Sequence, residues 1–263
     1  MRTKLVAGNW KMNLTATESS AVVEAFVGLV DQRLDVDVVL CPPYLSIHRV
    51  RELIRRTHIK LGAQDVFWKE NGAFTGQVSP TMLRDEGVAF CIVGHSETRG
   101  KFGKLEVPES ALGFFSETDE TVNLKLKALL YHSIVPILCV GETLAEREAG
   151  QTDQVIRTQL ERALDGIDSA EMGASVVAYE PVWAIGTGQT CDAEEANRVC
   201  GMIRNCLGEV CDADTAAMVR ILYGGSVKAS NSAQIFSQPE IDGGLVGGAS
   251  LDPREFSLIV LSA

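Results

Sequence analysis

The sequence predicts an α/β protein that folds as a single (β/α)8 barrel. Short, continuously apolar runs recur along the 263 residues, and longer stretches with helical periodicity separate them. Continuous rather than alternating apolar runs are typical of parallel strands that helices cover on both faces. No linker or change of composition divides the chain. Eight such units in roughly 250 residues fit one closed barrel, so we expect residues 1–263 to form one domain.

The expected strands are eight short apolar runs: residues 5–7, 36–40, 59–63, 90–93, 135–140, 176–179, 220–223 and 244–246. Helices are expected between them, for example over 152–164 and over 19–30, where Val22, Val23, Phe26, Leu29 and Val30 share one face. The alternative is an open, doubly wound sheet, which usually carries a glycine-rich turn after its first strand. Gly8-Asn9-Trp10-Lys11 follows the first strand instead, and this favours the barrel.

Composition and charge narrow the range of partners. Apolar residues make up 46% of the chain, as in globular proteins, and the net charge is −11. A chain this acidic has no general attraction for nucleic acid, so local features must hold any anionic ligand. No apolar stretch approaches the roughly 20 residues of a membrane helix, and the N-terminus does not resemble a signal peptide. Seven cysteines without a C-x-x-C pair indicate a reduced, cytoplasmic protein.

Chemically useful side chains follow several of the expected strands, at the edge where parallel α/β folds carry their sites. Asn9 and Lys11 follow the first strand, His95 and Glu97 the fourth, and Glu180 the sixth. Gly224-Gly225-Ser226 and Gly247-Gly248 follow the last two strands, where backbone N–H groups of glycine turns can approach a phosphate. Each glycine pair alone is better explained by a tight turn. Both pairs together at these two strand ends favour a phosphate site.

Each charged residue also has an ordinary explanation: a structural histidine, a surface glutamate or a surface lysine. Together, however, one carboxylate, one imidazole, one ammonium and a phosphate cradle suit proton transfer beside the carbonyl of a small phosphorylated substrate. We expect burial at the barrel mouth to raise the pKa of Glu180 and make it a base. The chain has no H-E-x-x-H or G-x-S-x-G motif, so neither a metal nor a hydrolase triad is expected.

Six ordered motifs resemble the triosephosphate isomerase family. They are Ala7-Gly8-Asn9-Trp10-Lys11-Met12-Asn13, Gly72-Ala73-Phe74-Thr75-Gly76, Val93-Gly94-His95-Ser96-Glu97, the run from Ala178 to Gly188, Tyr223-Gly224-Gly225-Ser226-Val227 and the run from Leu245 to Leu251. The resemblance implies a TIM barrel that interconverts dihydroxyacetone phosphate and glyceraldehyde 3-phosphate in glycolysis and gluconeogenesis. It also implies a homodimer that needs no cofactor and no metal.

The resemblance implies a role for each matching residue. Glu180 is the expected base, His95 the neutral electrophile and Lys11 the stabilising cation. Asn9 is expected to position substrate oxygens, and Glu97 to orient Lys11 and His95. The expected phosphate ligands are backbone N–H groups of Gly186, Ser226, Gly247 and Gly248. Residues 181–190 resemble the family's mobile lid, with Pro181 and Trp183 in its hinge and Ala184, Ile185 and Gly186 in its tip. Tyr223 and Ser226 are expected to hold the closed tip, and Cys139 to pack beside Glu180.

Three places depart from the family pattern. Gln77 and Thr98 stand where the family carries a glutamate and an arginine that pair across its dimer, so the affinity of the dimer is open. Residues 100–117 form a longer segment than the family usually shows, in which Pro108 can start a short helix that packs on the barrel. This segment is either a tolerated surface insertion or an altered contact with a partner. Gln189 occupies the far lid hinge in place of a lysine.

Two other functions compete with the isomerase. A Schiff-base aldolase of the same barrel class needs a lysine on a late strand, and the late strands carry none. A non-catalytic phosphate-binding or interaction protein on the same barrel would not need the Glu180 base, so its presence favours the enzyme.

Overall fold

A closed barrel of parallel strands forms the centre of the molecule. The computed structural model describes residues 2–30, 32–104 and 107–263. In this part of the chain eight strands pair in sequence order, and β1 closes the barrel against β8. The strands are β1 (Leu5–Asn9), β2 (Asp37–Cys41), β3 (Lys60–Ala63), β4 (Phe90–Val93), β5 (Val135–Val140), β6 (Val176–Tyr179), β7 (Arg220–Tyr223) and β8 (Gly243–Val246).

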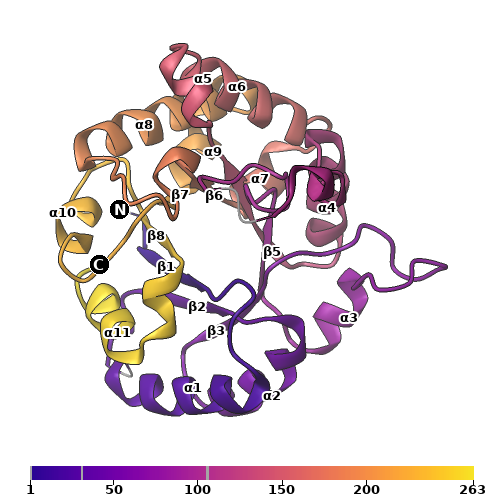
Figure 1. Cartoon of the computed structure of the whole chain (residues 1–263), viewed down its shortest axis with the longest axis vertical. Helices are drawn as coiled ribbons and strands as arrows, with labels where there is room; N and C mark the ends of the chain where they lie inside the picture. The colour runs from indigo at the N-terminus through magenta and orange to yellow at the C-terminus, as the bar shows by residue number, and fades with distance from the viewer. Residues whose placement is uncertain (1, 31, 105–106) are drawn as a thin grey trace.

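Helices surround the barrel on its outside (Figure 1). They are α1 (Ala16–Val30), α2 (Tyr44–Ile54), α3 (Pro80–Asp85), α4 (Asp119–Tyr131), α5 (Leu144–Glu148), α6 (Thr152–Ala163), α7 (Ser169–Gly173), α8 (Ala193–Val210), α9 (Ala213–Met218), α10 (Ser232–Phe236) and α11 (Pro253–Leu261), with the 3-10 turns η1 (Glu109–Phe114), η2 (Val182–Ala184) and η3 (Gly248–Leu251). The predicted (β/α)8 barrel is therefore confirmed. Among the described residues no helix has the length and apolar character needed to cross a membrane.

The strands are buried on both faces, as their continuous apolar sequences predict. Side chains such as Ala7, Ile92 and Cys139 form one cluster, and side chains such as Val6, Val93 and Val177 pack in a second cluster that includes the helices. Neighbouring residues of one strand thus belong to different clusters. This alternation places every second side chain inside the barrel. Because all the strand pairs are parallel, the carboxyl ends of the strands lie at one mouth.

The sequence prediction fails at one position of the first helix. Leu29 is 45% exposed, although the pattern places it on the buried face with Phe26 and Val30. Ser19 is buried instead, and its hydroxyl donates a hydrogen bond to Ser46 of α2 over 3.0 Å. The buried stripe of α1 therefore runs through residue 19, and Leu29 lies at its solvent edge.

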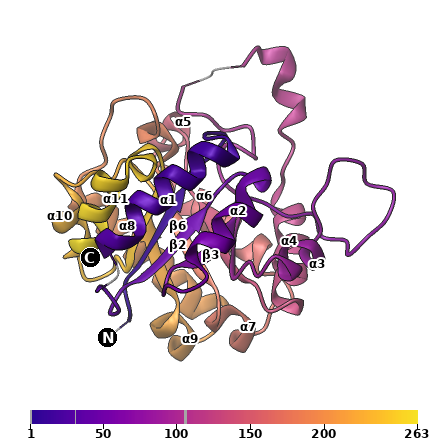
Figure 2. The ribbon, with the colours of Figure 1, turned by 90° about the horizontal axis from the view of Figure 1, so that it is seen from below.

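Two segments extend away from the barrel. The segment between β3 and α3 projects far beyond the helices in both views (Figures 1 and 2). In the segment 100–117, Pro108 precedes the turn η1, as the proline predicts. The turn does not pack on the barrel as expected, because none of its residues is buried and Phe114 is 85% exposed. Figure 2 shows this turn standing apart from the strands.

Candidate active site

One cavity at the carboxyl end of the barrel brings most of the predicted site residues together. Its volume is about 730 Å³, and the predicted residues that line it are Asn9, Lys11, His95, Glu97, Glu180, Ala184, Ile185, Gly186, Ser226, Gly247 and Gly248. Four other predicted residues are buried around the cavity without lining it: Cys139, Pro181, Trp183 and Tyr223. The cavity therefore contains the residues predicted to perform the chemistry, and the residues predicted to support them surround it.

Glu180 occupies the centre of the site, immediately after β6. Its side chain is 2% exposed. One carboxylate oxygen, Oε2, accepts a hydrogen bond from the backbone N–H of Ser96 over 3.0 Å. The other, Oε1, lies 2.8 Å from Nε2 of His95. No described residue gives Oε1 a well-aligned hydrogen bond, so this buried oxygen keeps a lone pair for chemistry.

The two buried groups shift each other's pKa. Burial alone raises the pKa of Glu180, but the neighbouring His95, the Ser96 N–H and Lys11 outweigh it, and the net pKa is lowered. This is the opposite of the direction expected from burial. Burial lowers the pKa of His95, yet the carboxylates of Glu180 and Glu97 raise it above its usual value. The arrangement of the site therefore favours a charged Glu180.

The backbone fixes the orientation of the His95 ring. Gly94 follows β4 with a φ of +70°, and a Cβ at Gly94 would lie 3.2 Å from the carbonyl oxygen of Cys139. The turn therefore requires glycine. The N–H of Glu97 donates a hydrogen bond of 3.1 Å to Nδ1 of His95. Because Nδ1 accepts, a neutral ring carries its proton on Nε2, which faces Glu180.

Lys11 is held in an unusual backbone conformation, with a φ of +52°. Its N–H donates to Oδ1 of Asn9 over 3.0 Å, and its carbonyl accepts from Nε2 of Gln64 over 2.9 Å. Its ammonium lies 2.5 Å from the carboxylate of Glu97. Gln64 thus holds the backbone of Lys11, and sequence analysis assigns it no role. The available signal is its place directly after the third strand.

The lining of the cavity is locally positive although the chain carries a net charge of −11. Lys11, Lys101, Lys104 and Lys228 line it, against the carboxylates of Glu97 and Glu180. A concave, cationic lining attracts small anions. Sequence analysis missed Lys101, Lys104 and Lys228, and the only signal for the first two is the location of their segment after the fourth strand.

The predicted phosphate ligands lie at the ends of three neighbouring strands. Gly186 follows β6 with a φ of +70°, Ser226 follows β7, and Gly247 and Gly248 follow β8. A Cβ at Gly247 would lie 3.6 Å from Cε of Lys11, so the lysine stem passes beside this glycine. The glycines thus give an anion access to backbone N–H groups next to a cation.

Side chains beneath the predicted lid fix its first hinge. Nε1 of Trp183 donates a hydrogen bond of 2.8 Å to Glu142, and the guanidinium of Arg147 lies 4.3 Å from the centre of the Trp183 ring. Burial raises the pKa of Glu142. Tyr223 is buried against the same layer, with its ring 6.4 Å from that of Tyr179. Burial also raises the pKa of the Cys139 thiol, which suits a packing role.

Potential metal ligands form no cluster in the part of the chain that the structure describes. Within residues 2–30, 32–104 and 107–263, no group of three or more histidine, cysteine, aspartate or glutamate side chains is arranged to hold a metal ion.

Comparisons with known proteins agree with the geometry of the cavity. A family model described as "Triosephosphate isomerase" matches residues 4–263. The protein named triosephosphate isomerase from Dictyoglomus thermophilum is 43% identical over 262 residues, which cover 100% of both chains. Those of Caldanaerobacter subterraneus subsp. tengcongensis and Thermoanaerobacter pseudethanolicus are 45% and 44% identical over 260 residues, which cover 99% of each chain. The chain therefore belongs to the triosephosphate isomerase family.

Proposed function

We propose that this protein interconverts dihydroxyacetone phosphate and glyceraldehyde 3-phosphate by proton transfer through an enediolate. The observation that carries this proposal is the buried pair of Glu180 and His95, 2.8 Å apart in a cavity lined by lysines. Proton abstraction next to a carbonyl needs a base and a hydrogen-bond donor for the developing oxyanion. The lysines and glycine backbones suit the phosphate of the substrate.

Each residue of the pair has one part in the reaction. Oε1 of Glu180 takes a proton from one substrate carbon and returns it to the neighbouring carbon, while the hydroxyl proton of the substrate passes from one oxygen to the other. The Nε2–H of neutral His95 donates a hydrogen bond to the substrate oxygen that gains negative charge. This division of roles is the one already established for triosephosphate isomerases in general. The hydrogen bond from the Glu97 N–H to Nδ1 keeps the proton of His95 on Nε2.

The cations and the backbone complete the site. Lys11 stabilises negative charge on the substrate and the enediolate, and Asn9 holds the Lys11 backbone while it contacts substrate oxygens. The N–H groups of Gly186, Ser226, Gly247 and Gly248 bind the phosphate. No bound cofactor enters any of these steps, because the reaction only moves protons within one substrate.

Movement of the lid couples substrate binding to the basicity of the Glu180 carboxylate. His95 and the Ser96 N–H lower the pKa of Glu180, and a carboxylate with a low pKa is a poor base. The lid begins at the next residue, Pro181. Closure of the lid therefore draws Glu180 away from Ser96 and excludes water, and both changes raise the basicity of the carboxylate. Tyr223 and Ser226 hold the closed tip.

The protein acts as a homodimer in the cytoplasm. The segment between β3 and α3 projects from the barrel, its residues 69–77 are exposed, and Met12 beside the site is 95% exposed. A second copy of the chain can cover these surfaces, and buried apolar area outweighs the missing pair at Gln77 and Thr98. The seven free cysteines suit a reducing compartment. The domain is a single unit, and residues 100–117 are an extension of it.

The test is isomerisation of glyceraldehyde 3-phosphate by the purified protein across a dilution series. Glu180→Gln should abolish turnover but keep phosphate binding, because the amide preserves shape and removes the base. Glu240→Gln is the control, since Glu240 pairs with Arg204 and lies outside the cavity. Folded wild-type protein without activity at any concentration would instead support the non-catalytic binding protein. Loss of specific activity on dilution would locate a weak dimer interface.

A further inference from the structure

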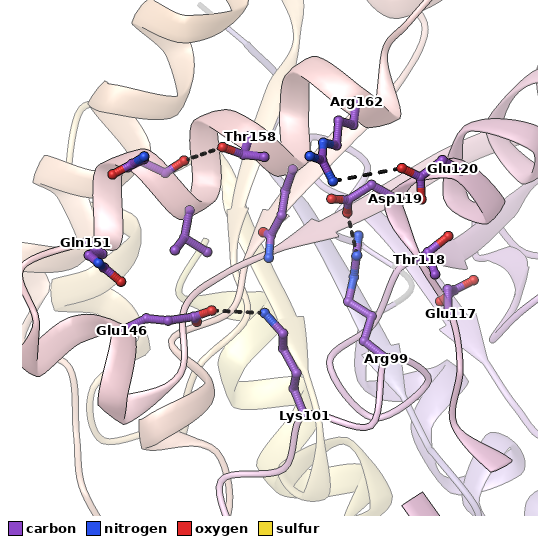
Figure 3. A pocket seen from close by; sticks show the side chains of 13 residues that line it. Arg99, Lys101, Glu117, Thr118, Asp119, Glu120, Glu146, Gln151, Thr158 and Arg162 are labelled. Atoms are coloured by element: carbon purple, nitrogen blue, oxygen red, sulfur yellow. Dashed lines mark hydrogen bonds and ion pairs between the residues drawn. The ribbon is translucent and has the colours of Figure 1, made fainter. Parts of the chain in front are cut away.

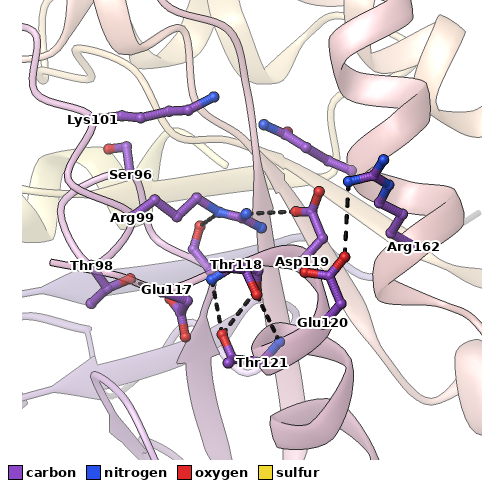
Figure 4. A network of polar contacts seen from close by, with 12 residues as sticks. Ser96, Thr98, Arg99, Lys101, Glu117, Thr118, Asp119, Glu120, Thr121 and Arg162 are labelled. Carbon is purple, nitrogen blue, oxygen red and sulfur yellow. Dashed lines mark hydrogen bonds and ion pairs between the residues drawn. The ribbon is translucent and has the colours of Figure 1, made fainter. Parts of the chain in front are cut away.

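Hydrogen bonds connect the two ends of the segment 100–117 to the loop that carries His95. The N–H of Glu117 donates to the carbonyl of Thr98 over 3.3 Å, and the Thr98 hydroxyl donates to the Glu117 carboxylate. Arg99 donates to the carbonyl of Gly94 over 2.7 Å. It also donates to Asp119 over 2.6 Å, as Figure 4 shows. These bonds fix both ends of the segment against the start of α4.

The first residues of the segment are also held by contacts with the rest of the protein. The N–H of Lys101 donates to the carbonyl of Ser96 over 2.9 Å. Its ammonium lies 3.3 Å from Glu146 of α5, across the polar hollow drawn in Figure 3. The ring of Phe102 meets the edge of Phe115, with centroids 5.3 Å apart. Gly103 follows directly, so its backbone has little freedom to retreat.

Gly103 touches the backbone of the lid. A Cβ at this position would lie 2.2 Å from the carbonyl oxygen of Ile185 and 2.6 Å from that of Val182. It would also lie 2.9 Å from Cγ2 of Thr187. Gly103 has no positive φ, so glycine is required here for space and not for backbone conformation. The segment 100–117 and the lid therefore pack backbone to backbone.

In this contact the carboxylate of Glu180, the residue before the lid, accepts from the Ser96 N–H and lies 2.8 Å from His95. The protein itself engages the base in this position of the lid, so this is the resting position and not the one in which Glu180 takes a substrate proton. We propose that Gly103 is a positioning residue for the lid: it forms the surface on which the open lid rests between turnovers. This inference rests on the proposed function only in taking residues 181–190 as the catalytic lid. It also assigns a role in positioning the lid to Gly103, which belongs to the segment 100–117.

The proposal predicts the direction in which Gly103→Ala shifts the lid. The added methyl group cannot fit against the Ile185 carbonyl, so the resting position loses stability relative to the closed one. A ligand that binds the closed lid then binds more tightly, because less free energy is needed to leave the resting position. A purely structural role for Gly103 would lower the melting temperature without tightening any ligand.

The experiment compares Gly103→Ala with Gly113→Ala. Gly113 lies in the same segment, has no positive φ, and leaves open space where a Cβ would stand, with no atom within 4 Å. Inorganic phosphate is the probe, measured by calorimetry and by competitive inhibition. We expect Gly103→Ala to bind phosphate at least about threefold more tightly and to lower KM, while Gly113→Ala matches wild type. Fluorine NMR of 5-fluorotryptophan at Trp183, assigned by its loss in Trp183→Phe, should show a shifted resonance in Gly103→Ala alone.

A second variant tests the same contact from the lid. Thr187→Ser removes Cγ2, which faces Gly103, and keeps the hydroxyl that donates to the Trp183 carbonyl over 2.7 Å. It should shift phosphate binding in the same direction by a smaller factor. Weaker phosphate binding in Gly103→Ala would place the contact in the closed state and overturn the proposal, as would an unchanged affinity with an unchanged fluorine spectrum. Calorimetry and NMR need no turnover, so these outcomes are distinct from a failure of the isomerase proposal.

Discussion

Gly141→Ala should strongly lower kcat, although Gly141 itself touches no substrate. Gly141 follows β5, and a Cβ there would lie 1.7 Å from the carbonyl oxygen of Glu180. Ordinary contact needs more than 3 Å, so one backbone must move by about 1.5 Å. Gly141 cannot retreat easily, because the buried amide of Gln159 accepts from its N–H over 2.8 Å and donates to its carbonyl over 3.0 Å. The displacement therefore falls mainly on Glu180.

A misplacement of about 1 Å at a reacting group costs on the order of 10²-fold in rate. We therefore expect kcat of Gly141→Ala to fall about 100-fold or more, with phosphate binding changed much less. The assay is steady-state isomerisation beside calorimetric phosphate titration, with circular dichroism to establish folding. Glu180 also takes part in the strand ladder, since its N–H donates to Val140 over 2.8 Å, so the melting temperature should fall as well. A folded variant with near-normal kcat would refute this account of how Glu180 is placed.

Three further predictions use single substitutions. Gly28→Ala, in the exposed face of α1 with open space around it, should stabilise the fold by about 1 kcal/mol in chemical denaturation; a loss of stability would contradict it. Asp65 accepts a hydrogen bond of 2.6 Å from the buried ammonium of Lys125, and its carboxylate raises the pKa of that lysine. Asp65→Asn removes one of the carboxylates that compensate this buried charge, so the melting temperature should fall by about 3 °C or more near pH 7; an unchanged melting temperature would contradict this. In Glu180→Gln the pKa of His95 should fall, because the carboxylate that raises it is gone; a histidine NMR titration measures this, and an unchanged pKa would exclude the coupling.

Much of the fold was predictable because strands that are buried on both faces have continuously apolar sequences. The runs 90–93, 135–140, 176–179 and 220–223 coincide with β4 to β7. The site was predictable for a related reason, since parallel strands deliver whatever follows them to one mouth. Leu29 was misplaced because a helical pattern defines a stripe but not its edges.

The properties that sequence analysis missed depend on contacts between loops. Gln64 holds Lys11 through its backbone, and no periodicity links those two positions. Gly103 meets Ile185 from a different strand end, and an isolated glycine in a loop gives no sign of what it touches. Sequence analysis missed the direction in which the pKa of Glu180 shifts for the same reason, because this direction also depends on contacts between loops. Burial could be expected from its position, but the Ser96 N–H and the ring of His95 that outweigh burial could not.

These loop contacts explain how an enzyme of this kind can keep its base inactive until substrate arrives. The Ser96 N–H and His95 hold Glu180 in a weakly basic state, and the chain continues from Glu180 directly into the lid. In the mechanism that we propose, a lid resting on Gly103 keeps Glu180 in that state, because one short stretch of backbone joins the two. In the same mechanism, phosphate bound beneath the closing lid moves both together. Basicity of Glu180 and exclusion of water then arise in one step, so that the free protein does not carry an exposed strong base.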